Sequence, residues 1–399
     1  MIRAALAEVH AQAVSRAAMP SLREYDPWLL GSVAAIAGFG LVMLTSASIM
    51  IGDRLYGDPF HFLLRQIVAL GIGVTLALVA ARTPLETMER ASSMFLLLGV
   101  FLLVLVVIPG LGKEVNGSLR WLALGPVTMQ PSEPAKLCFV IYLAGYLVRH
   151  ADSVRNEFVG FIKPIVLVTI MGALLLIEPD YGTAAVLIAT ALGMLFLGGV
   201  SLSRFCAWGA IASTALLVMA IKEPYRVARL ATFMDPWADP FASGFQLTQA
   251  LIAFGRGEWF GVGLGASVQK LFYLPEVHTD FIFAIVGEEL GFAGTCTLIA
   301  AYAFLVWRIF HIGARALAAD QPFGAYLSYG VGLIIGLQAF VNMGVNMGVL
   351  PTKGLTLPLM SYGANSLLFT AASIGLVARV ALETNAPLAA RAPVAGGRS

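Results

Sequence analysis

The sequence predicts an all-α integral membrane protein of ten transmembrane helices, with cytoplasmic N- and C-termini and a long, partly helical outer loop between helices 7 and 8. Three observations support this fold class. The 399 residues are 59% hydrophobic and only 12% charged, with a mean hydropathy of +0.84, whereas a soluble domain carries about twice that charge. Ten apolar runs are long enough to cross a bilayer, and basic residues concentrate on one side of them.

A helix needs about 20 apolar residues to cross the hydrocarbon. Runs of this kind lie near 27–50, 61–80, 92–109, 133–149, 161–177, 181–199, 203–221, 281–307, 325–350 and 363–382. They define a membrane domain at 27–382 between tails at 1–26 and 383–399. The first 20 residues lack the apolar core of a signal peptide, so the N-terminal tail is expected to remain in the cytoplasm.

The basic residues orient the ten spans. With a cytoplasmic N-terminus, the inner side collects Arg3, Arg16, Arg23, Arg82, Arg90, Arg149, Arg155, Lys163, Arg204, Arg308, Arg315, Arg379, Arg391 and Arg398. The short outer loops hold Arg54, Lys113, Arg120 and Lys353. Fourteen inner against four outer cations is the positive-inside pattern, which places both termini in the cytoplasm.

The outer segment 222–280 is far longer than the other connections. Within its FQLTQALIAF stretch, Leu247, Ala250, Leu251 and Phe254 recur at helical spacing, which predicts a short amphipathic helix on or in the membrane surface. The glycines of GRGEWFGVGLG do not follow a predicted strand, so they do not indicate dinucleotide binding. A long ordered loop of this kind usually carries function.

Several classes of function are excluded by composition. A net charge of +2 without a long basic run argues against nucleic acid as a partner. Cys138, Cys206 and Cys296 each lie in apolar runs and form no metal or disulfide motif. No Walker motif is present, so nothing indicates the use of a nucleotide.

Charged side chains in or beside the spans are functional candidates by default, because they are costly in lipid. They are Arg65, Glu133, Lys136, Glu178, Asp180, Glu288 and Glu289. Glu133 and Lys136 are three residues apart on one helix face, so a structural ion pair is an equal interpretation. Glu288 is expected to pair with a cation from another helix.

Asp280 stands where the long outer loop becomes the eighth span. One interpretation is a helix N-terminal carboxylate, which the macrodipole favours. The other is a general base at the outer face. The outer side also offers cations that could hold an anionic group such as a phosphate, namely Arg120, Lys222, Arg226, Arg229, Arg256, Lys270 and Lys353.

Four outer-face segments together resemble one family. They are NGSLRWLALGPVTMQPSEPAK from 116, EPDYGTA from 178, LPEVHTDFIFAIVGEELGF from 274 and NMGVLPTKGLTLPLMSYGANSLL from 346. They are similar to the SEDS proteins (shape, elongation, division and sporulation), ten-span polymerases that build peptidoglycan glycan strands from lipid II. The resemblance covers about 27–382, and LPTKGLTLPL with HTDFIFAIVGEELG indicates the division branch.

The resemblance implies roles for individual residues. Asp280 matches the essential catalytic aspartate and Trp121 an important loop aromatic, while Arg65, Glu133, Lys136 and Asp180 match positions of less certain role. Lys353 and Ser361 belong to the last motif, where Lys353 is the better candidate for binding substrate and Ser361 is also explained as a helix cap. One departure is Ala364-Asn365, where the family usually has Gly-Ser.

The implied reaction joins one lipid-linked sugar to the GlcNAc 4-hydroxyl of another, with inversion and loss of undecaprenyl diphosphate. A carboxylate would take the hydroxyl proton, and Arg, Lys or a divalent cation (Mg or Mn) would neutralise the diphosphate. The implied partners are lipid II, the nascent glycan strand, a class B penicillin-binding transpeptidase of the FtsI type, and other single-span division proteins. Two alternatives stay open: a lipid II flippase, and a non-catalytic division scaffold.

Overall fold

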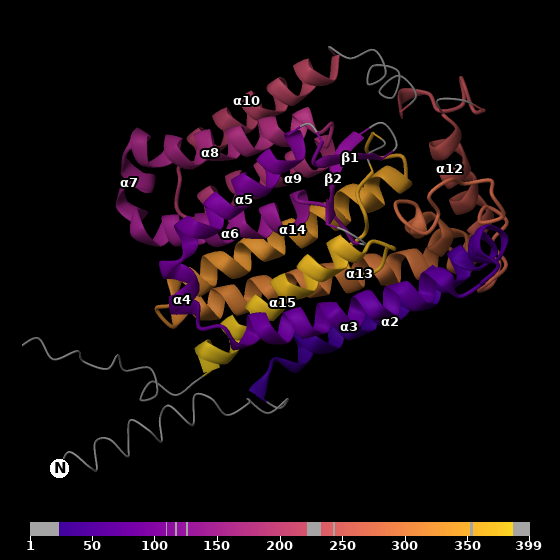
Figure 1. The fold of residues 1–399 in the computed structure, drawn as a ribbon, viewed down its shortest axis with the longest axis horizontal. Coiled ribbons are helices and arrows are strands. Elements are labelled where there is room, and N and C mark those ends of the chain that lie inside the picture. The colour runs from indigo at the N-terminus through magenta and orange to yellow at the C-terminus, as the bar shows by residue number, and fades with distance from the viewer. Residues whose placement is uncertain are drawn as a thin grey trace, which may run out of the picture.

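The structure, a computed structural model, describes residues 24–108, 110–115, 118–124, 127–221, 233–241, 244–351 and 354–385. Long helices run side by side as a bundle, with a small sheet and a short helix at one end (Figure 1). The helices are α2 (Pro27–Tyr56), α3 (His61–Arg82), α4 (Leu85–Arg90), α5 (Ser92–Val107), α6 (Ser132–Arg149), α7 (Ala151–Asn156), α8 (Phe158–Ile177), α9 (Tyr181–Leu197), α10 (Leu202–Ile221), α12 (Phe245–Gly257), α13 (Ile282–Ala318), α14 (Pro322–Asn346) and α15 (Ala364–Asn385).

A helix lies on each range predicted to be a span. Within the described residues, six helices are long and apolar enough to cross a membrane by length and composition, namely α2, α3, α8, α13, α14 and α15. Two shorter apolar helices, α5 and α9, accompany them. Large apolar side chains of α3, including Leu64, Val68 and Val79, remain exposed on the outside of the bundle. An apolar exterior over helices of this length identifies a multi-pass membrane protein.

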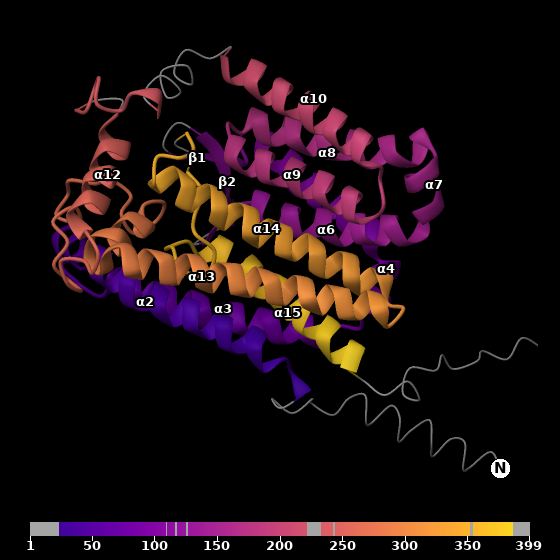
Figure 2. The same ribbon diagram turned by 180° about the vertical axis from the view of Figure 1, so that it is seen from behind.

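The connections gather at two opposite ends of the bundle (Figures 1 and 2). One end, the basic end, carries α4, α7 and the turns at 198–201 and 319–321. Arginines tie this end together: Arg155 donates to the Gly198 carbonyl, and Arg308 pairs with Asp26 before α2. The other end, the sheet end, carries the strands, the turn at 178–180 and the segments at 258–281 and 354–363.

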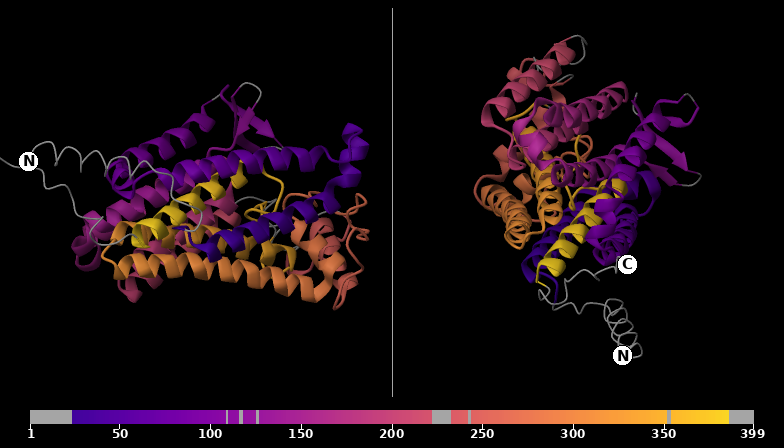
Figure 3. Two further views of the ribbon diagram at one scale, coloured as in Figure 1. Left: turned by 90° about the horizontal axis from the view of Figure 1, so that it is seen from below. Right: turned by 90° about the vertical axis from the view of Figure 1, so that its left-hand side faces the viewer.

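The all-α prediction was wrong at 112–129, where three antiparallel strands form a sheet in the order β1–β2–β3. They are β1 (Gly112–Val115), β2 (Ser118–Leu124) and β3 (Val127–Met129), and β1 and β2 project from the side of the helices (Figure 3). Lys113 lies opposite Trp121 in the ladder. Short strands paired with their sequence neighbours leave too few residues for a period-2 pattern, so the sequence gives a weak signal for them.

Helix α12 confirms the helix predicted in the long loop, with its apolar face packed on protein. Leu247 and Ala250 are buried, and Phe254 lies against Phe283 of α13 with ring centroids 5.6 Å apart. A Cβ on Gly257 would come within 1.9 Å of the Gly287 carbonyl oxygen, so only glycine fits at this crossing. The amphipathic pattern is therefore explained by docking against α13 rather than by contact with lipid.

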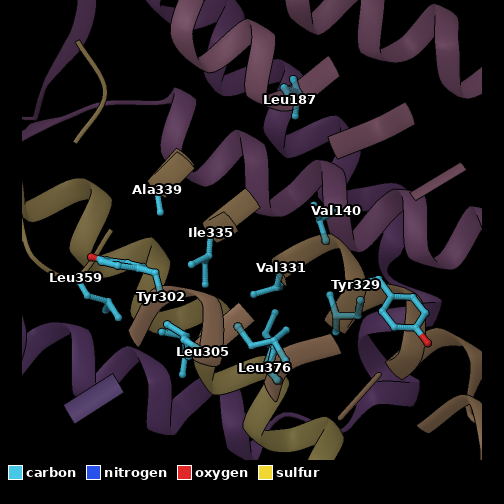
Figure 4. Packing of buried hydrophobic residues seen from close by; sticks show 14 of the residues in the cluster. Val140, Leu187, Tyr302, Leu305, Tyr329, Val331, Ile335, Ala339, Leu359 and Leu376 are labelled. Atoms are coloured by element: carbon cyan, nitrogen blue, oxygen red, sulfur yellow. The ribbon is translucent and has the colours of Figure 1, made fainter. Parts of the chain in front are cut away.

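The core lies between α6, α13, α14 and α15 (Figure 4). Ile335 of α14 points toward Leu305 of α13, and Leu376 of α15 lies beside them (Figure 4). The Tyr302 hydroxyl donates to the Pro358 carbonyl, which gives this buried polar atom a partner. This hydrogen bond and the apolar packing around it hold the 354–363 segment against α13 at the sheet end.

Candidate active site

Asp280 lies two residues before α13, where two side chains of α14 hold its backbone. The Nδ2 atoms of Asn342 and Asn346 each donate to the Asp280 carbonyl oxygen at 2.9 Å. The Asp280 side chain is partly buried. Within the described part of the chain, its carboxylate has no hydrogen-bond donor, and it does not cap α13, whose N-cap residue Phe281 makes no side-chain cap bond. The described residues therefore leave its acceptor capacity unused.

The surroundings of Asp280 favour its protonated form more than water does. Burial raises the pKa of its carboxyl to about 7, and the negative charges of Glu276 and Asp180 add to this rise. The Arg120 guanidinium opposes it. A carboxyl with a pKa near 7 is ionised in an appreciable fraction at neutral pH and is a stronger base than an ordinary aspartate.

Arg120 joins the sheet to the turn between α8 and α9. Its Nε donates to the Glu178 carbonyl at 3.1 Å, and its Nη2 donates to the Pro179 carbonyl at 2.5 Å. Its charge also acts on Asp280, so these two predicted residues lie within electrostatic range of each other. Trp121 follows Arg120 in β2, and successive strand residues point to opposite faces, so its ring lies on the other face of the sheet.

Glu178, a charged candidate to which the sequence assigned no role, lies beside Arg120. It is 1% exposed, and within the described residues neither carboxylate oxygen has a hydrogen-bond partner. Burial, together with the negative charge of Asp180, raises its pKa to about 8, while Arg120 lowers it. Asp180 is satisfied as the N-cap of α9, where it accepts from Thr183. The two acids of the EPD stretch, Glu178 and Asp180, were the signal in the sequence that indicated this position.

Glu133 and Lys136 form the buried ion pair that their spacing allowed. Lys136 Nζ donates to Glu133 Oε1 and to Gln338 Oε1, both at 2.9 Å. Gln338 Nε2 in turn donates to the Thr356 carbonyl at 3.0 Å. The pair of α6 is thereby connected through α14 to the 354–363 segment, and each charge has its partner inside the protein.

Ser361 closes a turn in the 354–363 segment. Its Oγ accepts from the Leu357 backbone N–H at 2.8 Å, and its carbonyl accepts from Gln66 of α3 at 3.0 Å. Its interpretation as a helix cap was wrong, because α15 begins at Ala364 and the hydroxyl accepts from Leu357, four residues before Ser361. Arg65, beside Gln66 in α3, is exposed. At the departure from the family pattern, Asn365 donates to the Thr128 carbonyl of β3 at 3.2 Å.

Lys353 lies outside the described residues, as do Lys222, Arg226 and Arg229. Gly354, which follows Lys353, lies against the carboxylate of Asp280. A Cβ built on Gly354 would be 2.9 Å from Asp280 Oδ2. The last motif therefore reaches the site directly through its backbone.

Glu288 pairs with a cation from another helix, as predicted. Arg256 of α12 donates to Glu288 Oε1 at 3.0 Å, and Val268 N–H donates to the same oxygen at 3.0 Å. Glu289 is bound by Lys270 Nζ at 2.9 Å and by the Ser46 hydroxyl. Both glutamates fasten the 258–270 segment to α13 beside Gly291, whose positive φ breaks the helix.

In the ranges that the structure covers, no group of three or more His, Cys, Asp or Glu side chains could hold a metal ion. A metal site made by these side chains alone therefore does not fit this set of residues. A cation that accompanied a diphosphate would take most of its ligands from the diphosphate oxygens.

Comparisons with known proteins show the family of the chain. The model of the cell cycle protein family of FtsW, RodA and SpoVE matches residues 27–386. A probable peptidoglycan glycosyltransferase FtsW of Thioalkalivibrio sulfidiphilus is 55% identical over 359 residues, covering 90% of each chain.

Two solved structures share the fold. One belongs to a peptidoglycan synthase complex described for its coordination of polymerization and crosslinking, with a TM-score of 0.74 and 32% identity over 90% of this chain and 98% of that one. The other is the rod shape determining protein RodA of Thermus thermophilus, with a TM-score of 0.67 and 30% identity over 92% of this chain and 100% of that one. The chain belongs to the cell cycle protein family of FtsW, RodA and SpoVE.

Proposed function

We propose that the chain is a peptidoglycan glycosyltransferase that polymerises lipid II into β-1,4 glycan strands during cell division and releases undecaprenyl diphosphate. The observation that carries the proposal is Asp280, a partly buried carboxyl with a pKa near 7 and a fixed backbone. The relative at 55% identity is named as a probable enzyme of this activity. A scaffold has no need of a base at this place.

Asp280 is the general base of the reaction. As the acceptor GlcNAc 4-hydroxyl attacks the donor anomeric carbon, its proton passes to the Asp280 carboxylate. The bond from the anomeric carbon to the diphosphate oxygen breaks, and the electron pair leaves with undecaprenyl diphosphate. General-base assistance of this kind contributes roughly 100- to 10,000-fold in rate.

The departing diphosphate requires positive charge. Arg120 is the described cation whose charge acts on Asp280, and Lys353 precedes Gly354, which touches the Asp280 carboxylate. These two residues are the proposed anion-binding groups. Two hydrogen bonds from Arg120 to backbone carbonyls hold its guanidinium in a fixed orientation, which lowers the cost of ordering it around an anion.

The proposed arrangement in the membrane has ten spans, with the basic end in the cytoplasm and the sheet end outside. It is supported by the clustering of arginines at the basic end and by the positive-inside rule. Tags at residues 85 and 155 are expected to report the cytoplasm, and tags at 115 and 240 the outer side. A cytoplasmic report at 240 would contradict the site assignment, because assembled lipid II is used outside.

The proposed partner is a class B penicillin-binding transpeptidase that crosslinks the new strand at the septum. It is supported by the structural neighbour, which was solved as a peptidoglycan synthase complex coordinating polymerization and crosslinking. Other single-span division proteins complete the proposed assembly. Equal polymerisation rates with and without bound transpeptidase would contradict activation by this partner while leaving the enzyme assignment intact.

One experiment separates the proposed function from its alternatives. The purified chain is reconstituted into vesicles with fluorescent lipid II, with and without the transpeptidase. Glycan strands separated by electrophoresis are the expected product. Movement of lipid II across the bilayer without strands would identify a flippase, and neither activity in the presence of the bound transpeptidase would identify a scaffold.

A further inference from the structure

Two asparagines of α14 bind one backbone atom of the proposed base. Asn342 and Asn346 are one helical turn apart, and both are fully buried. Each donates its Nδ2 to the Asp280 carbonyl oxygen at 2.9 Å. A carbonyl oxygen has two lone pairs, so these two bonds saturate it. The peptide group that carries Asp280 is therefore held from one side by α14.

Each asparagine makes a second contact that extends this attachment. Asn342 Nδ2 also donates to the Leu355 carbonyl at 2.5 Å. Asn346 Oδ1 accepts from the Ala284 backbone N–H at 3.1 Å, a donor in the first turn of α13 that the Phe281 carbonyl also shares at 3.0 Å. The start of α13, the Asp280 peptide and the 354–363 segment are thereby bound to one face of α14.

The attached segment is also the one that meets the Asp280 carboxylate. Gly354 lies so close that an added Cβ would be 2.9 Å from Asp280 Oδ2. The neighbouring Tyr362 N–H donates to the His278 carbonyl at 2.8 Å, which is a second attachment between the same two stretches of chain. A shift of the 354–363 segment would therefore move the carboxylate.

We propose that Asn342 and Asn346 are positioning residues for glycosyl transfer: they fix the Asp280 peptide to α14 and, through Asn342, to the segment that follows Lys353. The inference rests on the proposed role of Asp280 as the general base. A base must lie within hydrogen-bond reach of the proton that it takes, and a misplacement of about 1 Å costs roughly 100-fold in rate. The asparagines keep the base and the anion-binding segment in a constant relation.

Loss of the attachment has an electrostatic consequence that a simple folding defect lacks. The charged groups that act on Asp280 are Glu276 of its own loop, Asp180 before α9 and Arg120 of β2. His278, two residues before Asp280, has its pKa lowered by burial. Asn342 and Asn346, on α14, carry no charge. A loosened Asp280 becomes better hydrated, so its pKa falls toward the usual value near 4.

The test compares Asn346→Ala and Asn342→Ala with Asn365→Ala, in full-length purified protein assayed on lipid II. Asn365 is a matched control, because it also donates to a backbone carbonyl at the sheet end, but on β3. We expect kcat to fall roughly 10- to 100-fold for the two α14 variants with KM within about twofold. The acidic limb of the pH profile of kcat/KM is expected to move to lower pH, and Asn365→Ala should leave both unchanged.

Asn346→Ala is the milder change, because it leaves the Asn342 bonds to both the Asp280 and the Leu355 carbonyls in place. It is the deciding variant if Asn342→Ala does not fold. Hydrogen exchange of the peptide covering 278–286 should become faster in Asn346→Ala. Faster exchange with an unchanged kcat and an unmoved pH limb would overturn the proposal, while an inactive Asp280→Asn would still support the base. An active Asp280→Asn would overturn both, so the two failures are distinguishable.

Discussion

Two pairs of acids at the sheet end have opposite surroundings. Glu288 and Glu289 are both fully buried, yet Arg256 and Lys270 neutralise them and several N–H and O–H groups donate to them. Glu178 is equally buried, and neither its carboxylate nor that of Asp280 has a hydrogen-bond donor among the described residues. The first pair fastens a loop to α13, and the second pair lies in the candidate active site.

The difference shows how the same residue type serves structure in one place and chemistry in another. A buried carboxylate with a cation and several donors is stable as an anion and holds its neighbours in place. A buried carboxylate without them has a raised pKa, which is about 8 for Glu178 and about 7 for Asp280. The second kind exchanges a proton near neutral pH, which general-base catalysis requires.

The largest expected effect is a loss of stability when the ion pair of Lys270 and Glu289 is broken. Lys270→Met removes the cation that binds Glu289, so an anion is left buried with only neutral donors. Removal of one partner from a buried pair costs about 3–5 kcal/mol. We expect a strongly lowered midpoint of thermal unfolding in detergent and a low yield of folded protein.

Arg65→Gln is the matched control for this change, because Arg65 is an exposed cation. Its effect on stability should stay within about 0.5 kcal/mol. A Lys270→Met protein as stable as the control would show that Glu289 does not depend on its cation, and the contrast between the two pairs would be lost.

Replacement of Glu178 by Gln is expected to have a smaller effect on stability, and in the opposite direction: it raises Tm. Its folded-state pKa of about 8 lies above its usual value near 4.5, so the folded protein binds this proton more tightly than the unfolded chain does. The stability from this proton is present below about pH 4.5 and is lost as the pH rises through 8. Glu178→Gln keeps the neutral shape, so its Tm should match wild type at pH 5 and exceed it by about 2 °C or more at pH 8.5.

The control for this measurement is Glu258→Gln, a change of an exposed acid at the same end, which should shift Tm equally little at both pH values. If Glu178→Gln instead lost stability at pH 8.5, the Glu178 carboxylate would have a partner as an anion, and it would belong with Glu288 and Glu289.

The smallest effects concern the charges around Asp280. Activity should rise with pH as Asp280 ionises, with a midpoint near 7. Glu276→Gln removes a negative charge that raises this pKa, so the rise should move to lower pH. Arg120→Gln removes a positive charge that lowers it, so the rise should move to higher pH. Each shift is expected to be below about one pH unit at moderate salt.

The pH dependence of kcat/KM on lipid II measures both shifts in one series. Shifts in the same direction for the two variants would mean that Asp280 is not the group that titrates. Arg120→Gln should also lose stability, because its two bonds to the carbonyls of 178 and 179 are lost.

The helices were predictable because a membrane imposes a simple rule on composition. Each apolar run of about 20 residues became a helix, and the depth of Glu288 in one of them required a cation, which Arg256 supplies. Helix ends were less predictable. Helix α13 continues to Ala318, past the end of the apolar run near 307, and Arg308 in this extension pairs with Asp26.

The rest of the site depends on contacts between distant segments. The contact of Arg120 with the Glu178 carbonyl depends on a sheet that the apolar pattern did not predict. The asparagines of α14 are ordinary polar residues in the sequence, and their importance appears only when the Asp280 carbonyl lies beside them. Asp280 itself was identified by its position and by the resemblance of HTDF to a family motif, while its raised pKa required the packed structure.

The most direct test of the account is lipid II polymerisation by purified, folded Asp280→Asn protein beside Glu276→Gln. Asparagine keeps the size of the side chain and leaves the backbone carbonyl for Asn342 and Asn346, so folding and transpeptidase binding should be normal. The account predicts a rate lowered by roughly 100- to 10,000-fold for Asp280→Asn and an active Glu276→Gln. Near-normal polymerisation by folded Asp280→Asn would contradict it and assign the proton to another group.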